Sequence, residues 1–183
     1  MIEIVYETHA TTEDNESGHA TGWLPGRLSA LGRQQARELG ERRRDDGLAA
    51  VFSSDLQRSV ETAEIALEGT QVPLLLDWRL RECDYGHRNG LPRDRVHDPD
   101  RAAFLDGPYP GGESWRQATS RVARLLRDLP SRWDGARVLL IGHVATLWAL
   151  EHHLGGCPLE QLVREELSWR EGWEYQLDTA MRF

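Results

Sequence analysis

The sequence predicts an α/β fold in which helices cover both faces of a mostly parallel sheet. Short apolar runs bounded by turn residues indicate buried strands, and they span residues 1–6, 48–53, 72–77 and 137–141. Segments of 10 to 17 residues with helical signals separate most of these runs. This alternation is typical of a three-layer α/β/α sandwich. A chain of 183 residues fits a single domain, 1–183.

The first expected helix spans residues 30–44. Ser29 can cap its N-terminus through the side-chain hydroxyl. Gly47 follows as a stop signal. The residues expected on the inner face of this helix are Leu31, Ala36 and Leu39.

Three further helices are expected along the chain. Ser54 or Asp55 is expected to cap the second helix, in which one face carries Val60, Ala63 and Leu67. The third spans about 113–129, after a turn at Gly111-Gly112, and its inward residues are Trp115, Val122 and Leu126. The fourth, 144–154, follows the strand at 137–141. The segment 166–178 is interpreted as two short strands around the turn Glu171-Gly172.

Composition narrows the class of protein. The formal net charge of −8 disfavours nucleic acid or an anionic membrane as a partner, because both require a basic surface. The two cysteines, Cys83 and Cys157, form neither a disulfide framework nor a zinc motif, which favours a reducing, cytoplasmic setting. No signal peptide is recognised, and no apolar run approaches the ~18 residues of a membrane span.

Polar residues follow three of the predicted strands at their C-terminal ends. His9 follows the first strand, the segment 53–58 follows the second, and His143 follows the strand at 137–141. Ligands of parallel sheets bind outside this edge, so these residues are expected to share one site. The irregular segment at about 83–112 is long for a connection and is expected to be functional.

Five ordered blocks, at 8–36, 53–63, 80–86, 111–114 and 142–143, resemble the histidine phosphatase superfamily, the phosphoglycerate-mutase-like proteins. The family's R-H-G-E-T-x-x-N motif lies over T-H-A-T-T-E-D-N at 8–15, followed by G-x-x-x-G-W at 18–23 and L-S-x-x-G-x-x-Q-A at 28–36. S-S-D-L-x-R-x-x-x-T-A is intact at 53–63, and L-R-E-x-x-Y-G occupies 80–86. G-G-E-S at 111–114 and G-H at 142–143 follow in the family's order.

The resemblance implies hydrolysis of a small phosphorylated metabolite without a metal or other cofactor. His9 would form a phosphohistidine, and Glu82 would be the acid and then the base. His143 would stabilise the phosphoryl group as a second donor, in either its neutral or its protonated form. Arg58, Asn15 and the Thr8 position would line the phosphoryl site. Substrate selection is expected from the irregular segment, in which the polar residues are His87, Arg88, Arg93, Arg95 and His97.

The sequence departs from the family beside the nucleophile. Thr8 replaces the motif arginine, Ala10 and Thr11 replace Gly and Glu, and Glu7 stands at an apolar strand position. Loss of an arginine fork removes up to two hydrogen bonds worth roughly 1.5–3 kcal/mol each. Glu7 requires an Arg or His partner if it points inward. The cluster 42–46 is interpreted as a solvated helix end.

Three explanations of these departures remain open. In the first, another arginine replaces the lost charge, and the candidates are Arg27, Arg33, Arg88 and Arg93. Alternatively, the site has changed its chemistry, or the fold serves a non-catalytic ligand- or protein-binding role. Hydrolysis is favoured over mutase activity because only about 25 residues separate Glu82 from the turn at 108–112, too few for the family's long mutase insertion.

Overall fold

The computed structural model describes residues 1–98, 100–165, 168–178 and 180. Its centre is a five-stranded sheet of order β3-β2-β4-β1-β5. The strands are β1 (Ile2–Thr8), β2 (Ala50–Ser53), β3 (Leu74–Leu76), β4 (Arg137–Gly142) and β5 (Trp173–Leu177). All neighbouring strands pair in parallel except β5, which is antiparallel to β1. This architecture confirms the predicted α/β class with a mostly parallel sheet.

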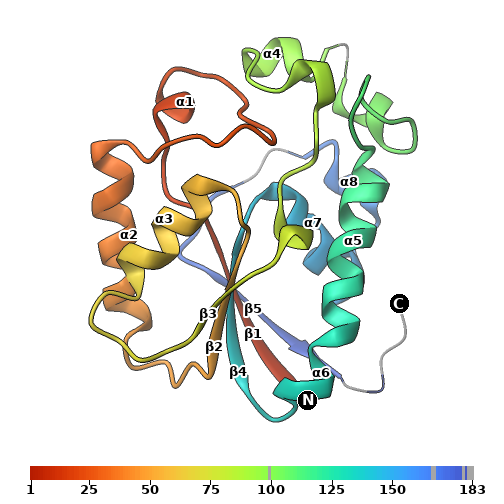
Figure 1. Cartoon of the computed structure of the whole chain (residues 1–183). Coiled ribbons are helices and arrows are strands. Elements are labelled where there is room, and N and C mark those ends of the chain that lie inside the picture. Colours follow the sequence, from red (N-terminus) through yellow and green to blue (C-terminus); the bar gives the residue numbers. More distant parts are fainter. Residues whose placement is uncertain (99, 166–167, 179, 181–183) are drawn as a thin grey trace.

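Helices cover both faces of the sheet (Figure 1). The α-helices are α1 (Glu13–Glu16), α2 (Ala30–Arg43), α3 (Gln57–Ala66), α4 (Arg93–Val96), α5 (Trp115–Asp128), α6 (Pro130–Trp133), α7 (Val144–His153) and α8 (Leu159–Leu162). The 3-10 helices are η1 (Trp78–Leu80), η2 (Gly86–Arg88) and η3 (Arg101–Phe104). The elements η2, α4 and η3 lie in the segment that the sequence predicts as irregular, near the carboxyl edge of the sheet (Figure 1).

Alternation along the strands explains the three layers. Side chains of opposite parity point to opposite faces. In β4, Val138 and Leu140 pack with α5 and α7, whereas Leu139 and Ile141 pack with α2 and α3. The sheet is therefore buried on both sides, which matches the continuous apolar run that predicts this strand.

The main helix caps follow the sequence signals, with one exception. Ser29 caps α2 through its hydroxyl, and Ser114 forms a capping box at α5. At α3 the prediction is wrong, because Leu56 is the N-cap residue and provides no side-chain bond. Asp55 instead pairs with Arg81 through two hydrogen bonds of 2.6 and 2.7 Å.

Two further predictions are corrected. Leu31 is 50% exposed and lies outside the inner face of α2, which consists of Gly32, Ala36, Leu39 and Gly40. Of the two C-terminal strands expected over 166–178, the described residues contain only β5. Residues 166–167 lie outside the described residues, and 168–172 form no strand. β5 finds its partner in β1, at the other end of the chain.

Candidate active site

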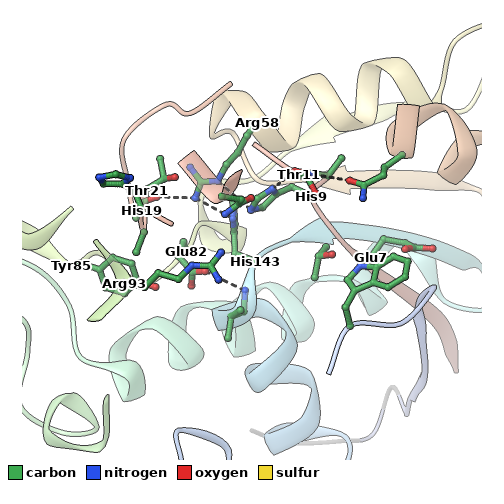
Figure 2. A pocket seen from close by; sticks show the side chains of 18 of the residues that line it. Glu7, His9, Thr11, His19, Thr21, Arg58, Glu82, Tyr85, Arg93 and His143 are labelled. Atoms are coloured by element: carbon green, nitrogen blue, oxygen red, sulfur yellow. Dashed lines mark hydrogen bonds between the residues drawn. The ribbon is translucent and has the colours of Figure 1, made fainter. Parts of the chain in front are cut away.

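A cavity of about 730 Å³ opens at the carboxyl edge of the sheet. Because β1 and β4 are parallel neighbours with Thr8 opposite Gly142, the residues that follow them emerge together. The rings of His9 and His143 lie 4.9 Å apart, centroid to centroid. Arg58, in the first turn of α3, lies between the two rings (Figure 2). Parallel pairing thus unites three side chains that are far apart in the sequence.

The ring of His9 has its proton on Nδ1 and its lone pair on Nε2. Its Nδ1 lies 2.8 Å from the carbonyl oxygen of Ala10, which places the proton on Nδ1. The other nitrogen, Nε2, accepts from Nε of Arg58 at 3.3 Å. Burial, together with the positive charge of Arg58, lowers the pKa of His9 to about 3. The imidazole is therefore neutral at pH 7 and suited to nucleophilic attack.

Arg58 is a buried cation held by backbone carbonyls. Its Nη1 donates to Leu24 O at 2.9 Å and its Nη2 to Gly22 O at 2.8 Å. Nη2 also lies 3.2 Å from Nδ1 of His143. Burial lowers the pKa of Arg58 to about 10, so the group remains protonated at neutral pH. The carbonyl oxygens of Gly22 and Leu24 hold the Arg58 guanidinium in the orientation in which it contacts both histidines.

His143 complements His9 as a donor. Since Arg58 donates to Nδ1, the ring proton belongs on Nε2, which is buried and has no partner within the described part of the chain. Burial, followed by the charge of Arg58, lowers the pKa of His143 well below its usual value. The ring is thus a neutral N–H donor, which is one of the two protonation states that the sequence leaves open. Tyr6 donates to its backbone carbonyl at 2.7 Å and anchors it.

Glu82 is a buried carboxyl at the N-terminus of α7. Its oxygens accept from the backbone N–H groups of Cys83 at 2.9 Å, Ala145 at 3.1 Å and Val144 at 3.3 Å. Burial raises the pKa of Glu82, although these hydrogen bonds and Arg58 act in the opposite direction. A raised pKa suits a group that must first give a proton and later take one.

Asn15 and Thr8 lie in the wall of the same cavity. The Oδ1 atom of Asn15 accepts from the N–H of Thr12 at 3.1 Å, as part of the capping box of α1. This bond turns the amide NH₂ of Asn15 away from the cap, and that NH₂ has no hydrogen-bond partner among the residues described. Asn15 therefore offers a free donor at the site.

The substrate-selecting candidates separate in the structure. Arg93 lies in the cavity wall together with His97, whereas His87, Arg88 and Arg95 do not. Arg88 instead donates to the carbonyls of residues 96 and 98 at 3.0 and 2.7 Å, and covers the ring of Phe104. Its side chain thus holds the irregular segment together. Of the four arginines proposed to replace the lost one, only Arg93 reaches the cavity; Arg27, Arg33 and Arg88 do not.

The cluster at 42–46 is wrongly interpreted as a solvated helix end. Glu7 is 2% exposed, and Arg43 donates to its Oε1 atom from Nη2 at 2.7 Å and from Nε at 2.9 Å. Arg42 lies 3.4 Å from both carboxylate oxygens and forms part of the cavity wall. The signal for this pairing was Glu7 itself, a carboxylate in an apolar strand that requires a cation.

The other residues of the cavity wall are not assigned to the site from the sequence, although Thr11, Gln35 and Tyr85 lie within the family motifs. They come from the loop before α2, from α2, from the irregular segment, from the start of α5 and from the residues before β5, and include Thr11, His19, Thr21, Gln35, Tyr85, Arg101, Trp115 and Trp169. Across the described residues, no three His, Cys, Asp or Glu side chains gather into a group suited to a metal ion. Nor do those residues include a helix long and apolar enough to cross a membrane.

Comparisons with known proteins agree with this geometry. Residues 8–171 match the family model of the histidine phosphatase superfamily, branch 1. The probable phosphoglycerate mutase GpmB of Salmonella typhi is 30% identical over 194 residues, covering 94% of this chain and 90% of that protein. The structure of YhfR from Bacillus stearothermophilus is 28% identical, with a TM-score of 0.83 over 93% of this chain and 88% of that one.

A mycobacterial glucosyl-3-phosphoglycerate phosphatase, in complex with VO3, is also similar. It is 29% identical, with a TM-score of 0.78 over 87% of this chain and 85% of that chain. The similar proteins thus include both a phosphatase and a probable mutase, and the family match spans nearly the whole sequence. This chain belongs to the histidine phosphatase superfamily, branch 1.

Proposed function

We propose that this protein hydrolyses a small phosphate monoester through a phosphohistidine on His9. The observation that carries the proposal is the protonation pattern of His9. Ala10 O accepts the hydrogen bond from the proton on Nδ1, so the lone pair of His9 is on Nε2, where it accepts from Nε of Arg58 at 3.3 Å and becomes available for attack when a phosphoryl oxygen takes that donor. A neutral nucleophile next to a fixed cation is what phosphoryl transfer requires.

In the first step, Nε2 of His9 attacks phosphorus and the ester P–O bond breaks. Glu82, in its protonated form, gives its proton to the leaving oxygen, so the product is a neutral alcohol. The negative charge on the phosphoryl oxygens is met by Arg58, by the Nε2–H of His143 and by the NH₂ of Asn15. These three donors take the part that a metal ion plays in other phosphatases.

In the second step, water attacks the phosphorus of phosphohistidine. The Glu82 carboxylate accepts a proton from this water, the N–P bond breaks, and its electron pair returns to Nε2 of His9. Orthophosphate leaves, and the enzyme regains its starting protonation. Hydrolysis is favoured over transfer to a second alcohol because the segment after Glu82 is short and its described residues form only the brief elements η2, α4 and η3.

Thr8 favours a second candidate, in which the site has changed its chemistry or only binds a ligand. Among the described cavity residues, Arg58 is the one arginine that contacts His9 and His143. A phosphatase with one such arginine should bind phosphate more weakly than relatives that retain both, and the first experiment must therefore separate weak turnover from none.

The test is turnover of a panel of phosphate monoesters without added metal, with wild type beside His9→Ala. We expect the variant to lose activity by about a thousandfold or more. His152→Ala, outside the cavity wall, is the matched control. With p-nitrophenyl phosphate, whose leaving group needs no acid, Glu82→Gln should accumulate a phosphohistidine visible by ³¹P NMR. No turnover of any ester by the wild type would reject hydrolysis and favour the second candidate.

A further inference from the structure

The cavity extends to both sides of the His9–His143 pair (Figure 2). On one side lie residues from the loop before α2 and from the irregular segment, including His19, Tyr85 and Arg93 (Figure 2). On the other side lies Glu7 (Figure 2). We name this second part the α2 arm, and define it as Glu7, Thr8, Thr11, Gln35, Leu39, Arg42 and Trp169. A volume of about 730 Å³ is far larger than a phosphoryl group requires.

Several polar groups in the α2 arm lack partners. Gln35 uses its Oε1 to accept from the N–H of Thr11 at 3.0 Å, and no described residue accepts from its NH₂. Nε of Arg42 is buried and has no hydrogen-bond partner among the described residues. The hydroxyls of Thr8 and Thr11 are likewise without a partner in that part of the chain. The half-buried side chains of Thr8, Thr11 and Gln35 line the cavity, so this arm offers a ligand both donors and acceptors.

The charge of the α2 arm is close to balanced. Glu7 binds Arg43 tightly, but its Oε2 atom has only the 3.4 Å contact with Arg42. An apolar residue at this strand position would avoid the cost of burying the carboxylate. In the opposite arm, Arg93 and Arg101 outnumber Asp94. The α2 arm is therefore the less suitable place for an anionic group.

Trp169 gives the α2 arm an aromatic wall. It is 59% exposed, which leaves its surface accessible, and the buried Leu39 is another apolar member of the arm. The chain just beyond Trp169 is tied down, since Nη2 of Arg43 donates to Glu171 O at 3.3 Å. Gly172, at φ +88°, packs so closely that a Cβ there would lie 2.1 Å from Nη2 of Arg43. The segment that carries Trp169 is therefore held against the Glu7–Arg43 ion pair.

We propose that the α2 arm binds an uncharged, hydroxyl-rich part of the substrate, such as a sugar or polyol. The inference rests on the proposed function, which places the phosphoryl group at His9. Unpaired donors and acceptors can bind hydroxyls, and an aromatic face can pack against the C–H groups of a sugar ring. A second anion would meet Glu7, whereas an alkyl chain would leave the polar groups unsatisfied.

The test compares esters of similar leaving alcohols. We would measure kcat/KM for trehalose 6-phosphate and glucose 6-phosphate relative to n-hexyl phosphate, in wild type, Trp169→Ala and Gln35→Met. The expected result is a preference for the sugar esters that falls about tenfold or more in both variants. Trp78→Ala, which removes another exposed tryptophan, outside the cavity wall, should keep the preference. A preference for hexyl phosphate, or a ratio unchanged by both substitutions, would overturn the inference.

A binding experiment separates this inference from the proposed hydrolysis. In the His9→Ala background, calorimetry would give the affinity for trehalose 6-phosphate and for orthophosphate, with and without Trp169→Ala. If Trp169→Ala weakens only the sugar ester, the α2 arm is supported even if the wild type hydrolyses no ester. If Trp169→Ala changes the affinities for the two ligands equally while the wild type is an active phosphatase, the inference fails and the proposed hydrolysis stands.

Discussion

Arg58 joins two histidines from different strands into one hydrogen-bonded chain. Its Nε contacts Nε2 of His9 and its Nη2 contacts Nδ1 of His143. The same charge helps to lower the pKa of both rings. A single buried guanidinium therefore helps to keep His9 neutral and orients His143 as an N–H donor. Both effects depend on the carbonyls of Gly22 and Leu24, which fix the fork.

Restoring the family's arginine at position 8 should strengthen phosphate binding. Thr8→Arg adds up to two charge-assisted hydrogen bonds, each worth roughly 1.5–3 kcal/mol. We expect the inhibition constant for orthophosphate to fall by about tenfold or more. Thr11→Arg adds the same charge elsewhere in the cavity wall and serves as the control. Equal effects of the two substitutions would indicate a general charge effect and contradict a specific role for position 8.

At the scale of elements, helix α5 holds the segment that carries Glu82. Arg121 of α5 is 0% exposed and donates to the carbonyls of Arg79, Arg81 and Glu82 at 2.8, 2.7 and 2.6 Å. The same guanidinium pairs with Glu113 through two bonds of 2.9 and 3.0 Å. With α7 donating to the carboxylate, Glu82 is fixed from both its backbone and its side chain.

Removing this clamp should destabilise the fold. Arg121→Met leaves Glu113 without its cation and the carbonyls of Arg79 and Arg81 without a donor, whereas Glu82 O keeps its bond from Nε1 of Trp23, so the free energy of unfolding should fall by about 3 kcal/mol or more. Arg116→Met, on the same helix, breaks ion pairs whose arginine is 44% exposed and should cost about 1 kcal/mol or less. Urea unfolding measures both. A loss of less than about 1 kcal/mol for Arg121→Met would contradict this stabilising role of Arg121.

At the scale of the whole molecule, burial of neutral histidines links folding to pH. The pKa of His9 is lowered to about 3 and that of His97 to about 4, in both cases mainly by burial, and the pKa of His143 also lies well below its usual value. Between pH 6.5 and about 4, the unfolded chain therefore binds more protons than the folded one. Stability falls as the pH falls through this window. Glu82, whose pKa is raised, acts with the opposite sign.

With His153, whose pKa burial lowers to about 4, four histidines should outweigh one carboxyl in this balance. Each contributes up to about 1.4 kcal/mol for each pH unit below its unfolded pKa. We expect the free energy of unfolding to decrease by about 2–4 kcal/mol between pH 7 and pH 5, measured by urea titration. His97→Gln should make this dependence shallower. A protein that gains stability on acidification over this range would contradict the assignment of neutral buried histidines.

The sequence by itself determined the regular elements and the edge at which the site forms. Apolar runs specify β2 and β4, and the Ser29 and Ser114 hydroxyls mark the starts of α2 and α5, because these signals act within a few residues. Since parallel strands bring their carboxyl ends together, the positions of His9 and His143 after two such strands predict a shared site.

The tertiary structure alone decided the contacts that set the chemistry. Glu7 finds its partners 35 and 36 residues away on α2, and β5 pairs with β1 from the other end of the chain. The neutral state of His143 depends on burial among separate elements and on Arg58. Which residues of the irregular segment reach the cavity depends on how that segment packs, as Arg88 and Arg93 show. Local patterns contain no information on such pairings, because burial and charge act through space rather than along the chain.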